Sequence, residues 1–574
     1  MSFVRAAAVH LFFVVFLVPR PAVAATEADL IPRVWNDAPV RIEVDGQADV
    51  ERIEALVPGR SPLAFDRPVG DTVRLRVTET EFERLREAGF EPVRVEDRER
   101  AGRTEAERVW ASRAGAAKRV LSFPLQTYPT HSEIGDFFAD LEAQYPDLVR
   151  AYTWGRSVDG RELWGLVISD HPDSNEAEPE VRLASGIHGD ETVQMVNLLN
   201  LAHELVTSYG QPRSARLDAI VEGTELHIQP LFNPDGYVRG IRTNANWVDL
   251  NRNFPEPAGT HSGQQPEVAD FIQYGLSKQF VISLMGHGGA LVVNYPWDYT
   301  YTRAPDDAAL IELSLEYSTR NLPMYNGAFS QGITNGADWY VITGSLQDWS
   351  YDQTDCIDLT LEVSNTKWPS SSTLLDYWDD NRESLLAFVE SARAGIHGEV
   401  TNAITGEPVD AVISVDGIDK PVSTDPERGD FYKLLADGTY TVRVDAAGYE
   451  PRTFFSVFNS WGAENRLDVA LTPVSTAAPS TRVAASIDRV APNPFNPRTQ
   501  IEFGLAEPGP ASLVVLDARG RRVRTLVDAS LPAGEHAAVW NGDDDTGATV
   551  GAGVYYLRLT AAGTTRSARV TLVP

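Results

Sequence analysis

Apolar runs of strand length alternate with helical patterns through the middle of this chain. In chain order they lie at 181–184 (strand), 192–206 (helix), 225–231 (strand), 267–274 (helix), 280–285 (strand), 308–318 (helix) and 357–362 (strand). Such alternation is typical of a mostly parallel or mixed sheet whose faces are covered by helices. Residues 123–394 are therefore predicted to form one large α/β domain.

The residues before this domain predict a smaller unit of mixed α and β structure. Alternating residues at 40–44 and 73–77 indicate strands, and residues 78–89 have the cap and the terminal glycine of a helix. The charged, alanine-rich segment 96–118 is typical of a linker or an exposed helix. Residues 26–122 are therefore expected to form an N-terminal region, in the position that a propeptide would occupy.

The residues after the α/β domain change to short alternating strands separated by glycine-containing turns. This pattern predicts a small β-sandwich over residues 395–473. Residues 474–486 are rich in Ser, Thr, Ala and Pro, a composition typical of a linker. Residues 487–574 alternate again and predict a second β-sandwich.

The first 25 residues have the composition of a secretory signal peptide. Arg5 precedes an apolar run at 6–18, and Ala22-Val23-Ala24 fits the small-residue cleavage rule. The run is shorter than the ~20 residues that a membrane-spanning helix needs, although an uncleaved anchor stays an alternative. The protein is therefore expected to be secreted, and no other segment predicts a transmembrane helix.

Charge and cysteine content narrow the classes of function. The chain has 574 residues, a net charge of −31 and one cysteine, Cys356. Such an acidic chain lacks the clustered Lys and Arg that nucleic-acid binding requires, but it would weakly attract cationic substrates. Cys356 begins an alternating run at 356–361, so we interpret it as a strand residue and not as a catalytic thiol.

Two histidines and a carboxylate could bind one metal ion. His188 and Glu191 lie three residues apart in a loop that follows one strand, and His287 follows another strand between glycines. Ligands gather at strand ends in open α/β sheets, and Zn²⁺ accepts imidazole and carboxylate together. Alone, however, a His-x-x-Glu pair is more often a solvated histidine beside an acid. The remaining histidines, including His171 and His227, stand in no motif and are interpreted as structural.

Polar residues are dense in further segments where an ordinary loop would not need them. The first is Asn233-Pro234-Asp235-Gly236, which by itself indicates only a turn. The others are Arg242-Thr243-Asn244-Ala245, Asp249-Leu250-Asn251-Arg252-Asn253-Phe254, Tyr340, Gln347-Asp348-Trp349 and, at the end of an apolar strand, Glu362.

The order of these segments resembles the M14 metallocarboxypeptidases, in the carboxypeptidase N/E-type branch, over residues 127–394. The resemblance continues into the transthyretin-like domain of that branch through Gly429-Asp430-Phe431-Tyr432 and Ala447-Gly448-Tyr449. The last domain resembles the FlgD-like, Ig-like modules of secreted bacterial enzymes through Asn493-Pro494-Phe495-Asn496-Pro497 and Trp540-Asn541-Gly542. The resemblance implies a mixed, twisted eight-stranded sheet flanked by helices, and a last module that acts in secretion or surface attachment.

The resemblance also implies how metal and substrate are held. His188, Glu191 and His287 would bind one Zn²⁺ ion. Asn251 and Arg252 would hold the C-terminal carboxylate of a peptide, because a guanidinium forms two parallel hydrogen bonds with a carboxylate. Tyr340, which lies eight residues before Asp348, would close over the same carboxylate.

The implied reaction is hydrolysis of the last peptide bond without a covalent intermediate. Zinc would lower the pKa of its water towards ~7. Glu362, fourteen residues after Asp348, would take the proton as general base and return it as acid to the leaving amine. Arg242 would polarise the scissile carbonyl and stabilise the oxyanion.

Asp298 and Gln347 predict which residue is released. By the resemblance, Asp298, eleven residues after His287, matches the acid that reads basic side chains in this branch, and Gln347 matches a glutamine of the same branch. Peptide C-termini ending in Lys or Arg are therefore the expected substrates. The alternative is that Asp298 is a surface acid, one of 81 acidic residues.

Two other functions stay open at this point. An amidase that acts on cell-wall peptides would keep the fold and differ in the pocket of Asp298 and Gln347. An inactive binding protein would use the β domains for adhesion, although relatives of that kind typically lose zinc ligands or the base, which are all present here.

Overall fold

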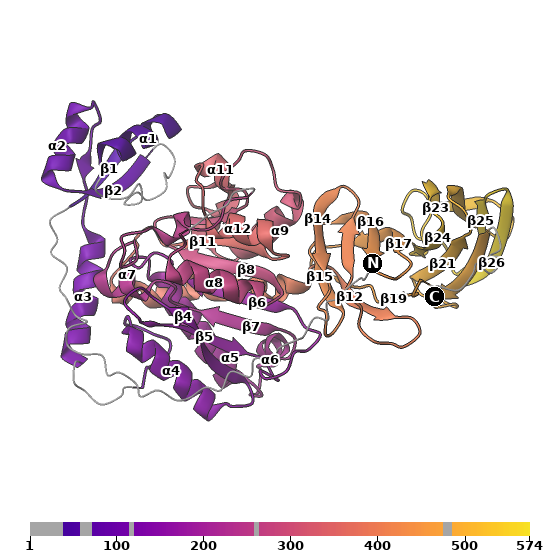
Figure 1. The fold of residues 1–574 in the computed structure, drawn as a ribbon, viewed down its shortest axis with the longest axis horizontal. Coiled ribbons are helices and arrows are strands. Elements are labelled where there is room, and N and C mark those ends of the chain that lie inside the picture. Colours follow the sequence, from indigo (N-terminus) through magenta and orange to yellow (C-terminus); the bar gives the residue numbers. More distant parts are fainter. Residues whose placement is uncertain (1–37, 58–71, 114–119, 258–262, 475–484, 574) are drawn as a thin grey trace, which may run out of the picture.

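The structure of the protein, a computed structural model, describes residues 38–57, 72–113, 120–257, 263–474 and 485–573 (Figure 1). The expected signal peptide and most of the expected linker lie outside these residues. Figure 1 shows a small N-terminal unit on one side of a large α/β domain and two β domains in a row on the other. None of the helices in the described part has the length and apolar run that a membrane crossing requires.

The N-terminal unit contains a short antiparallel sheet with strand order β2-β1-β3. Its elements are β1 (Ala38–Glu43), α1 (Gln47–Leu56), β2 (Thr72–Val77), α2 (Glu79–Glu87), β3 (Val93–Arg94) and α3 (Arg98–Arg113). Helix α2 begins where the sequence predicts it, because the Thr78 hydroxyl accepts the amide of Glu81 and the Glu81 carboxylate accepts the amide of Thr78.

Helix α3 corrects the expectation of a linker or exposed helix over 96–118. It is a helix, but Arg103 and Trp110 are buried against the α/β domain. The Arg103 guanidinium donates to the carbonyl of Tyr237 at 2.7 Å, and the Trp110 indole donates to the carbonyl of Tyr128 at 2.9 Å. Two side chains are enough to dock this charged helix, because the guanidinium and the indole donate hydrogen bonds to buried carbonyls. The low apolar content of the segment gives no sign of this docking.

The α/β domain is built on a mixed sheet that, within the described residues, has eight strands in the order β10-β9-β11-β8-β6-β7-β5-β4, which confirms the predicted fold class. The strands are β4 (Val149–Arg156), β5 (Glu162–Ile168), β6 (Glu180–Ser185), β7 (Glu225–Gln229), β8 (Phe280–His287), β9 (Leu291–Tyr295), β10 (Ile333–Asn335) and β11 (Ile357–Val363). The central strands β7, β6, β8 and β11 run parallel, so their carboxyl ends meet at one edge.

Helices cover both faces of this sheet (Figure 1). The main ones are α4 (His131–Gln144), α5 (Val193–Ser208), α6 (Ala215–Val221), α8 (Pro266–Leu276), α9 (Asp307–Ser318), α12 (Leu346–Gln353) and α13 (Leu374–Glu390). On β6, Val181 and Leu183 join the large cluster with α5 and α13, whereas Ala184 joins a second cluster with α8 and α12. This alternation buries both faces of the strands and explains their continuous apolar runs.

The first β domain is anchored to the α/β domain beside α12. Its strands are β12 (Gly395–Asn402), β13 (Val412–Val415), β14 (Ile418–Ser423), β15 (Asp430–Lys433), β16 (Gly438–Asp445), β17 (Arg452–Asn459), β18 (Glu464–Arg466) and β19 (Val469–Leu471). The Lys433 ammonium pairs with the Asp306 carboxylate at 2.7 Å, with both groups buried. The Lys420 ammonium donates to the carbonyls of Tyr351 and Thr354 at the end of α12.

The second β domain shares a sheet with the first. Its strands are β20 (Ala485–Ala491), β21 (Thr499–Leu505), β22 (Gly509–Leu516), β23 (Arg522–Leu531), β24 (Gly534–Trp540), β25 (Gly553–Ala561) and β26 (Thr564–Leu572). Strand β24 pairs with β17 in parallel, so a sheet in the order β14-β13-β16-β17-β24-β21-β20 runs through both domains. The two predicted sandwiches are therefore joined by backbone hydrogen bonds as well as by the chain.

Candidate metal centre and active site

Glycines shape the loop that carries His188 and Glu191. Gly186 follows strand β6 with φ +70°, a left-handed conformation that favours glycine. A Cβ at Gly189 would lie 2.0 Å from the carbonyl carbon of Gly236, so only glycine fits between the loop and the next segment. The loop therefore lies directly against α7 (Pro234–Arg239).

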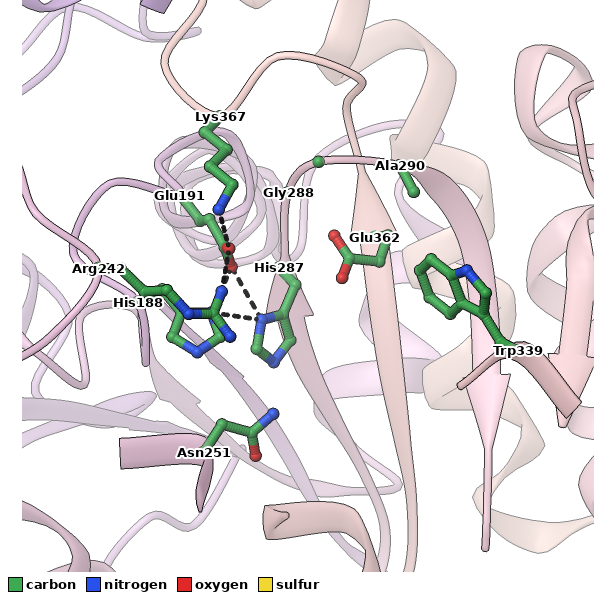
Figure 2. Close-up of a pocket in the computed structure, with 11 residues that line it drawn as sticks. His188, Glu191, Arg242, Asn251, His287, Gly288, Ala290, Trp339, Glu362 and Lys367 are labelled. Carbon is green, nitrogen blue, oxygen red and sulfur yellow. Dashed lines mark hydrogen bonds and ion pairs between the residues drawn. The ribbon is translucent and has the colours of Figure 1, made fainter. Parts of the chain in front are cut away.

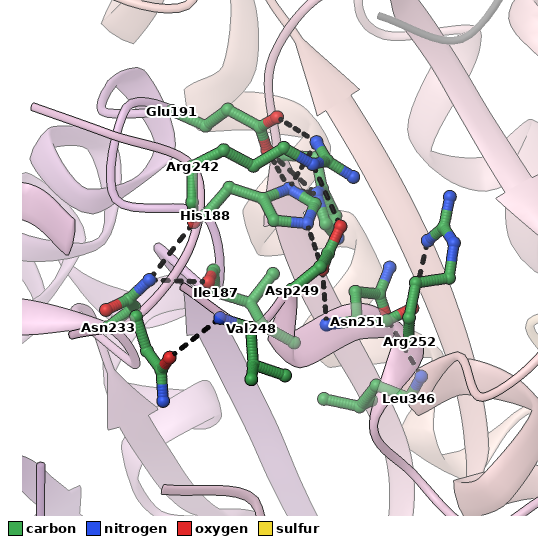
Figure 3. A network of polar contacts seen from close by, with 12 residues as sticks. Ile187, His188, Glu191, Asn233, Arg242, Val248, Asp249, Asn251, Arg252 and Leu346 are labelled. Atoms are coloured by element: carbon green, nitrogen blue, oxygen red, sulfur yellow. Dashed lines mark hydrogen bonds and ion pairs between the residues drawn. The ribbon is translucent and has the colours of Figure 1, made fainter. Parts of the chain in front are cut away.

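Asn233 connects this loop to the segment of Arg242. It caps α7 by accepting the amide of Gly236, and its side-chain amide donates to the carbonyls of Ile187 at 3.3 Å and Arg242 at 3.1 Å (Figure 3). The segment 233–236, which indicates only a turn in the sequence, is thus the start of a short helix. It fixes the two chain segments that carry a candidate metal ligand and a candidate oxyanion group.

The side chains of His188, Glu191 and His287 converge on one point at the carboxyl ends of β6 and β8 (Figure 2). His188 Nδ1 and His287 Nδ1 each lie 2.8 Å from Glu191 Oε2 and 3.0 Å from each other. All three residues are at most 4% exposed. Ligand atoms of a tetrahedral zinc ion at 2.0–2.1 Å would be about 3.3 Å apart. The two imidazoles and the carboxylate therefore fit a zinc ion.

Asp249 is a functional residue that the sequence reasoning missed. Its carboxylate accepts the Nε of Arg242 at 2.9 Å and the amide of Asn251 at 2.8 Å, and it lies 3.1 Å from His188 Nε2 (Figure 3). Burial opposes ionisation, but Arg242 and His188 hold the pKa of Asp249 well below its usual range. An anionic Asp249 orients the ring of His188 towards the candidate metal. In the sequence, its position two residues before the predicted site residue Asn251 was the one indication that Asp249 belongs to the site.

Two cations also approach Glu191. Arg242 Nη1 lies 3.2 Å from Glu191 Oε1 and 3.0 Å from His188 Nδ1, and the Lys367 ammonium lies 3.3 Å from Glu191 Oε1. Burial opposes ionisation of Glu191, but His188, Lys367 and His287 hold its pKa well below the usual value. Lys367 also lines the pocket and was not predicted.

Glu362 lies beside the candidate metal ligands. Strand β11 pairs with β8 in parallel, and Glu362 is in register with His287. Neighbouring strands are ~4.8 Å apart, so the two side chains are adjacent on the same face of the sheet. Both line the same pocket (Figure 2). Its other lining residues are His188, Glu191, Arg242, Asn251, Gly288, Gly289, Ala290, Trp339 and Lys367.

A buried polar cluster next to Glu362 contains Asp298 and Gln347. Asn294 links them: its side-chain amide donates to Asp298 Oδ1 at 3.2 Å, and it accepts from Gln347 Nε2 at 3.1 Å. Asn294 lies opposite Thr360 on β11, which places it about 7 Å along the same sheet face from Glu362. Asp298 is fully buried, so it is not a surface acid.

Asp348 holds the backbone of this cluster in place. Its carboxylate accepts the amides of Asp298 at 2.9 Å and Tyr299 at 3.0 Å. Asp348 and Gln347 are consecutive residues of α12, the helix against which the first β domain is anchored. The position of Asp298 therefore depends on that of α12.

The structure brings some of the remaining predicted residues to the site but not all of them. Asn251 lines the pocket, and Arg252 follows it in the short 3₁₀ turn Leu250–Arg252 with its side chain half-buried (Figure 3). Tyr340 is only 7% exposed and belongs to the hydrophobic cluster of the N-terminal unit. Its neighbour Trp339 lines the pocket in its stead.

Two further groups of acids and a histidine within the described residues could also hold a metal by distance alone. One, of Asp170, His171 and Glu176, lies in an exposed loop. The other, of Glu180, Glu225 and His227, is buried but contains the ammonium of Lys278, 2.5 Å from Glu225 Oε1. Neither group lines the pocket that Glu362 lines.

Two imidazoles and a carboxylate at the carboxyl edge of a mixed α/β sheet, with a further carboxylate on the adjoining strand, define a zinc hydrolase site. The comparisons with known proteins agree. The sequence model of the zinc carboxypeptidase family matches residues 134–384, that of the carboxypeptidase regulatory-like domain residues 395–472, and that of the FlgD Ig-like domain residues 494–565.

Individual relatives place the chain more closely. Human carboxypeptidase D is 38% identical over 348 residues, which cover 56% of this chain and 25% of that protein. The human carboxypeptidase N catalytic chain is 36% identical over 363 residues, which cover 54% of this chain and 79% of that protein. Carboxypeptidase A from Helicoverpa armigera has a similar fold, with a TM-score of 0.52 at 17% identity, covering 63% of this chain and 98% of that one.

The chain belongs to the M14 family of zinc carboxypeptidases, in the branch of carboxypeptidases D and N. It carries in addition the regulatory-like and FlgD Ig-like domains. The match spans about a quarter of the length of the carboxypeptidase D relatives.

Proposed function

We propose that the protein is an exported zinc carboxypeptidase that releases C-terminal Lys or Arg from peptides. The observation that carries the proposal is the convergence of His188, Glu191 and His287 beside Glu362 in one pocket. Family membership supports the reaction class. When bound by these ligands, zinc supplies a Lewis acid that polarises the scissile carbonyl and acidifies water.

Glu362 is the group that moves protons. It lines the pocket in register with His287, beside the candidate metal ligands, where a general base would act. It takes the proton of the attacking water and passes it to the leaving amine. Arg242, held by Asp249, presents its guanidinium to the same pocket and stabilises the negative charge that develops on the carbonyl oxygen.

The substrate is held by its C-terminal residue. Asn251 and Arg252 bind the terminal carboxylate, which restricts the enzyme to chain ends. The buried carboxylate of Asp298 pairs with the cationic side chain of a C-terminal Lys or Arg, and Asn294 and Gln347 supply polar partners around it. A buried acid favours a cationic side chain over an apolar one or that of D-Ala, which makes the cell-wall amidase the weaker alternative.

The N-terminal unit is proposed to act as an inhibitory propeptide. Tyr340 and Ile342 lie in one hydrophobic cluster with β1, β2 and α2, and are 7% and 5% exposed. If Tyr340 closes over the substrate carboxylate, it must first leave this cluster. Proteolytic removal of the N-terminal unit is therefore expected to raise kcat/KM at least about 10-fold, which corresponds to ~1.4 kcal/mol. Unchanged kinetics would contradict an inhibitory role.

Export is proposed from the composition of the first 25 residues, and surface attachment from the FlgD Ig-like match. Both are checked by locating the protein in culture: the full chain is expected outside the cytoplasm, and a form without residues 487–574 is expected in the medium instead of at the cell surface. A cytoplasmic full-length protein would contradict both.

The activity is tested by amino-acid release from a set of peptides that differ only in the last residue: Arg, Lys, Phe, D-Ala or diaminopimelate. Release of Arg and Lys is expected to dominate, to stop with a zinc chelator and to return with added zinc. Preference for D-Ala or diaminopimelate would establish the amidase. If no peptide releases an amino acid although zinc is bound, the result would support the alternative of an inactive binding protein.

A further inference from the structure

Trp247 adopts a backbone conformation that a large side chain rarely takes. Its φ is +63°, in the left-handed region, where a bulky residue pays a steric penalty that glycine does not. Its side chain is 70% exposed, so packing of the indole against the protein does not account for this strain. Among the exposed large hydrophobic residues of the described chain, Trp247 alone has a positive φ. Strained residues of this kind concentrate at functional sites.

The turn around Trp247 is rigid. The amide of Trp247 donates to the carbonyl of Asn244 at 3.0 Å, and the amides of Asn246 and Val248 donate to Asn244 Oδ1 at 3.0 and 3.1 Å. The side chain of Asn244 is fully buried and donates to Glu267 Oε2 at 3.2 Å. The exposed indole is therefore presented on a backbone that is fixed from beneath.

This turn adjoins the active site. Val248, the next residue, lies beside Asp249, whose carboxylate contacts His188 and Arg242 (Figure 3). Two residues of chain span at most about 7 Å, so the backbone of Trp247 lies within that distance of the backbone of Asp249. In the chain, the turn lies between Arg242 and Asn251, both of which line the pocket.

We propose that Trp247 binds the part of a longer peptide that precedes its last two residues, on the amino side of the bond to be cut. This inference rests on the proposed carboxypeptidase activity and adds a contact outside the pocket. The pocket residues read only the last residue and its carboxylate, so the rest of a peptide must leave across the rim. A flat indole contacts aliphatic, aromatic or guanidinium side chains alike, and on a rigid turn it loses little conformational freedom on binding.

The test compares two substrates with the same last two residues, both ending in Arg: an acylated dipeptide and a hexapeptide. Trp247→Gly is expected to lower kcat/KM for the hexapeptide by about 3–10-fold, mainly through KM, because aromatic contacts of this kind contribute such factors. For the dipeptide the change is expected to stay below about two-fold. Trp247→Phe is expected to keep most of the hexapeptide activity.

Thermal unfolding and a matched control separate substrate binding from a structural role. Trp247→Gly relieves the strain, so its Tm is expected to be unchanged or higher. Phe458→Ala removes another exposed aromatic side chain, in the first β domain. It is expected to leave kcat/KM unchanged for both substrates. A lower Tm, equal losses on both substrates or no loss on either would overturn the inference. If the wild type cleaves neither substrate, the proposed activity itself fails and this inference with it.

Discussion

Two groups of histidine and carboxylate lie at opposite ends of the same sheet. His188, Glu191 and His287 stand at the carboxyl ends of β6 and β8. Glu180, Glu225 and His227 stand at the amino ends of β6 and β7. In each group the ligand atoms lie within 4.8 Å of one another, and residue types alone do not distinguish the two.

Their surroundings do distinguish them. In the amino-end group, Lys278 contacts both Glu180 at 3.1 Å and Glu225 at 2.5 Å, and His227 contacts Glu225 through Nε2 and the Tyr274 hydroxyl through Nδ1. The Lys278 ammonium thus pairs with both carboxylates of this group. Cations also approach Glu191 in the carboxyl-end group, so charge pairing alone does not separate the two groups, and the pocket does. At the carboxyl end, three ligand atoms face one another in a pocket that Glu362 also lines. The amino-end group is therefore interpreted as structural and the carboxyl-end group as the candidate metal site.

The largest effect is expected from Glu362→Gln. This variant removes the carboxylate that lines the pocket beside the carboxyl-end group and that we propose as the general base. General acid–base groups contribute about 10²–10⁴-fold, and kcat on an Arg-terminated peptide is expected to fall by this factor. Zinc content is expected to stay the same, since Glu362 is not a ligand. A variant with near wild-type kcat would remove Glu362 from the mechanism.

Asp298→Asn is expected to have the next largest effect. It leaves the cation of a substrate Arg buried without a counter-charge, which costs ~3 kcal/mol, or about 100-fold in kcat/KM. Hydrolysis of a Phe-terminated peptide is expected to stay the same or improve. Equal losses on Arg and Phe substrates would show that Asp298 acts on the structure of the pocket and not on specificity.

Asp249→Asn tests the partner of a metal ligand. Loss of the anion that orients His188 is expected to weaken zinc binding by about 10–100-fold, measured by competition with a chromogenic chelator. Activity is expected to return at high zinc concentration. Unaltered zinc affinity would contradict the role given to Asp249.

Glu225→Gln tests the structural group through its pH dependence. Burial opposes ionisation, but His227 and Lys278 lower the pKa of Glu225 to about 2, below the usual 4.5. A depressed folded-state pKa stabilises the protein above the unfolded-state pKa, and this stability is lost as the pH falls from about 4.5 towards 2.

The variant is therefore expected to be less stable than the wild type by ~3 kcal/mol at pH 7, as measured by denaturant unfolding. This difference is expected to shrink below pH 4, and zinc content and kcat are expected to be unchanged. A constant difference from pH 7 to pH 3 would contradict the ionic origin of this stability.

The site residues that the sequence predicts are those at the ends of strands. The candidate zinc ligands and Glu362 are polar residues that terminate apolar runs, and the parallel order of β6, β8 and β11 brings such ends together. Cys356 is predicted to be a strand residue but lies immediately before β11. It is buried, and burial raises the pKa of its thiol, which disfavours the nucleophilic thiolate.

The sequence does not reveal residues whose role depends on a contact between distant segments. Asn294 lies within an apolar strand, and only the fold shows that it links Asp298 to Gln347. In the sequence, Lys367 is an ordinary turn residue. Only the fold shows that its ammonium lies 3.3 Å from Glu191 Oε1. The pairing of β17 with β24 uses backbone groups, which leave no side-chain pattern.

The most direct test of the account is the zinc content of three purified proteins: the wild type, His287→Ala and His227→Gln. One zinc per chain is expected in the wild type and in His227→Gln, and none in His287→Ala, which is expected to be inactive. Zinc that persists in His287→Ala, or that disappears in His227→Gln while the protein stays folded, would place the metal elsewhere and contradict the assignment.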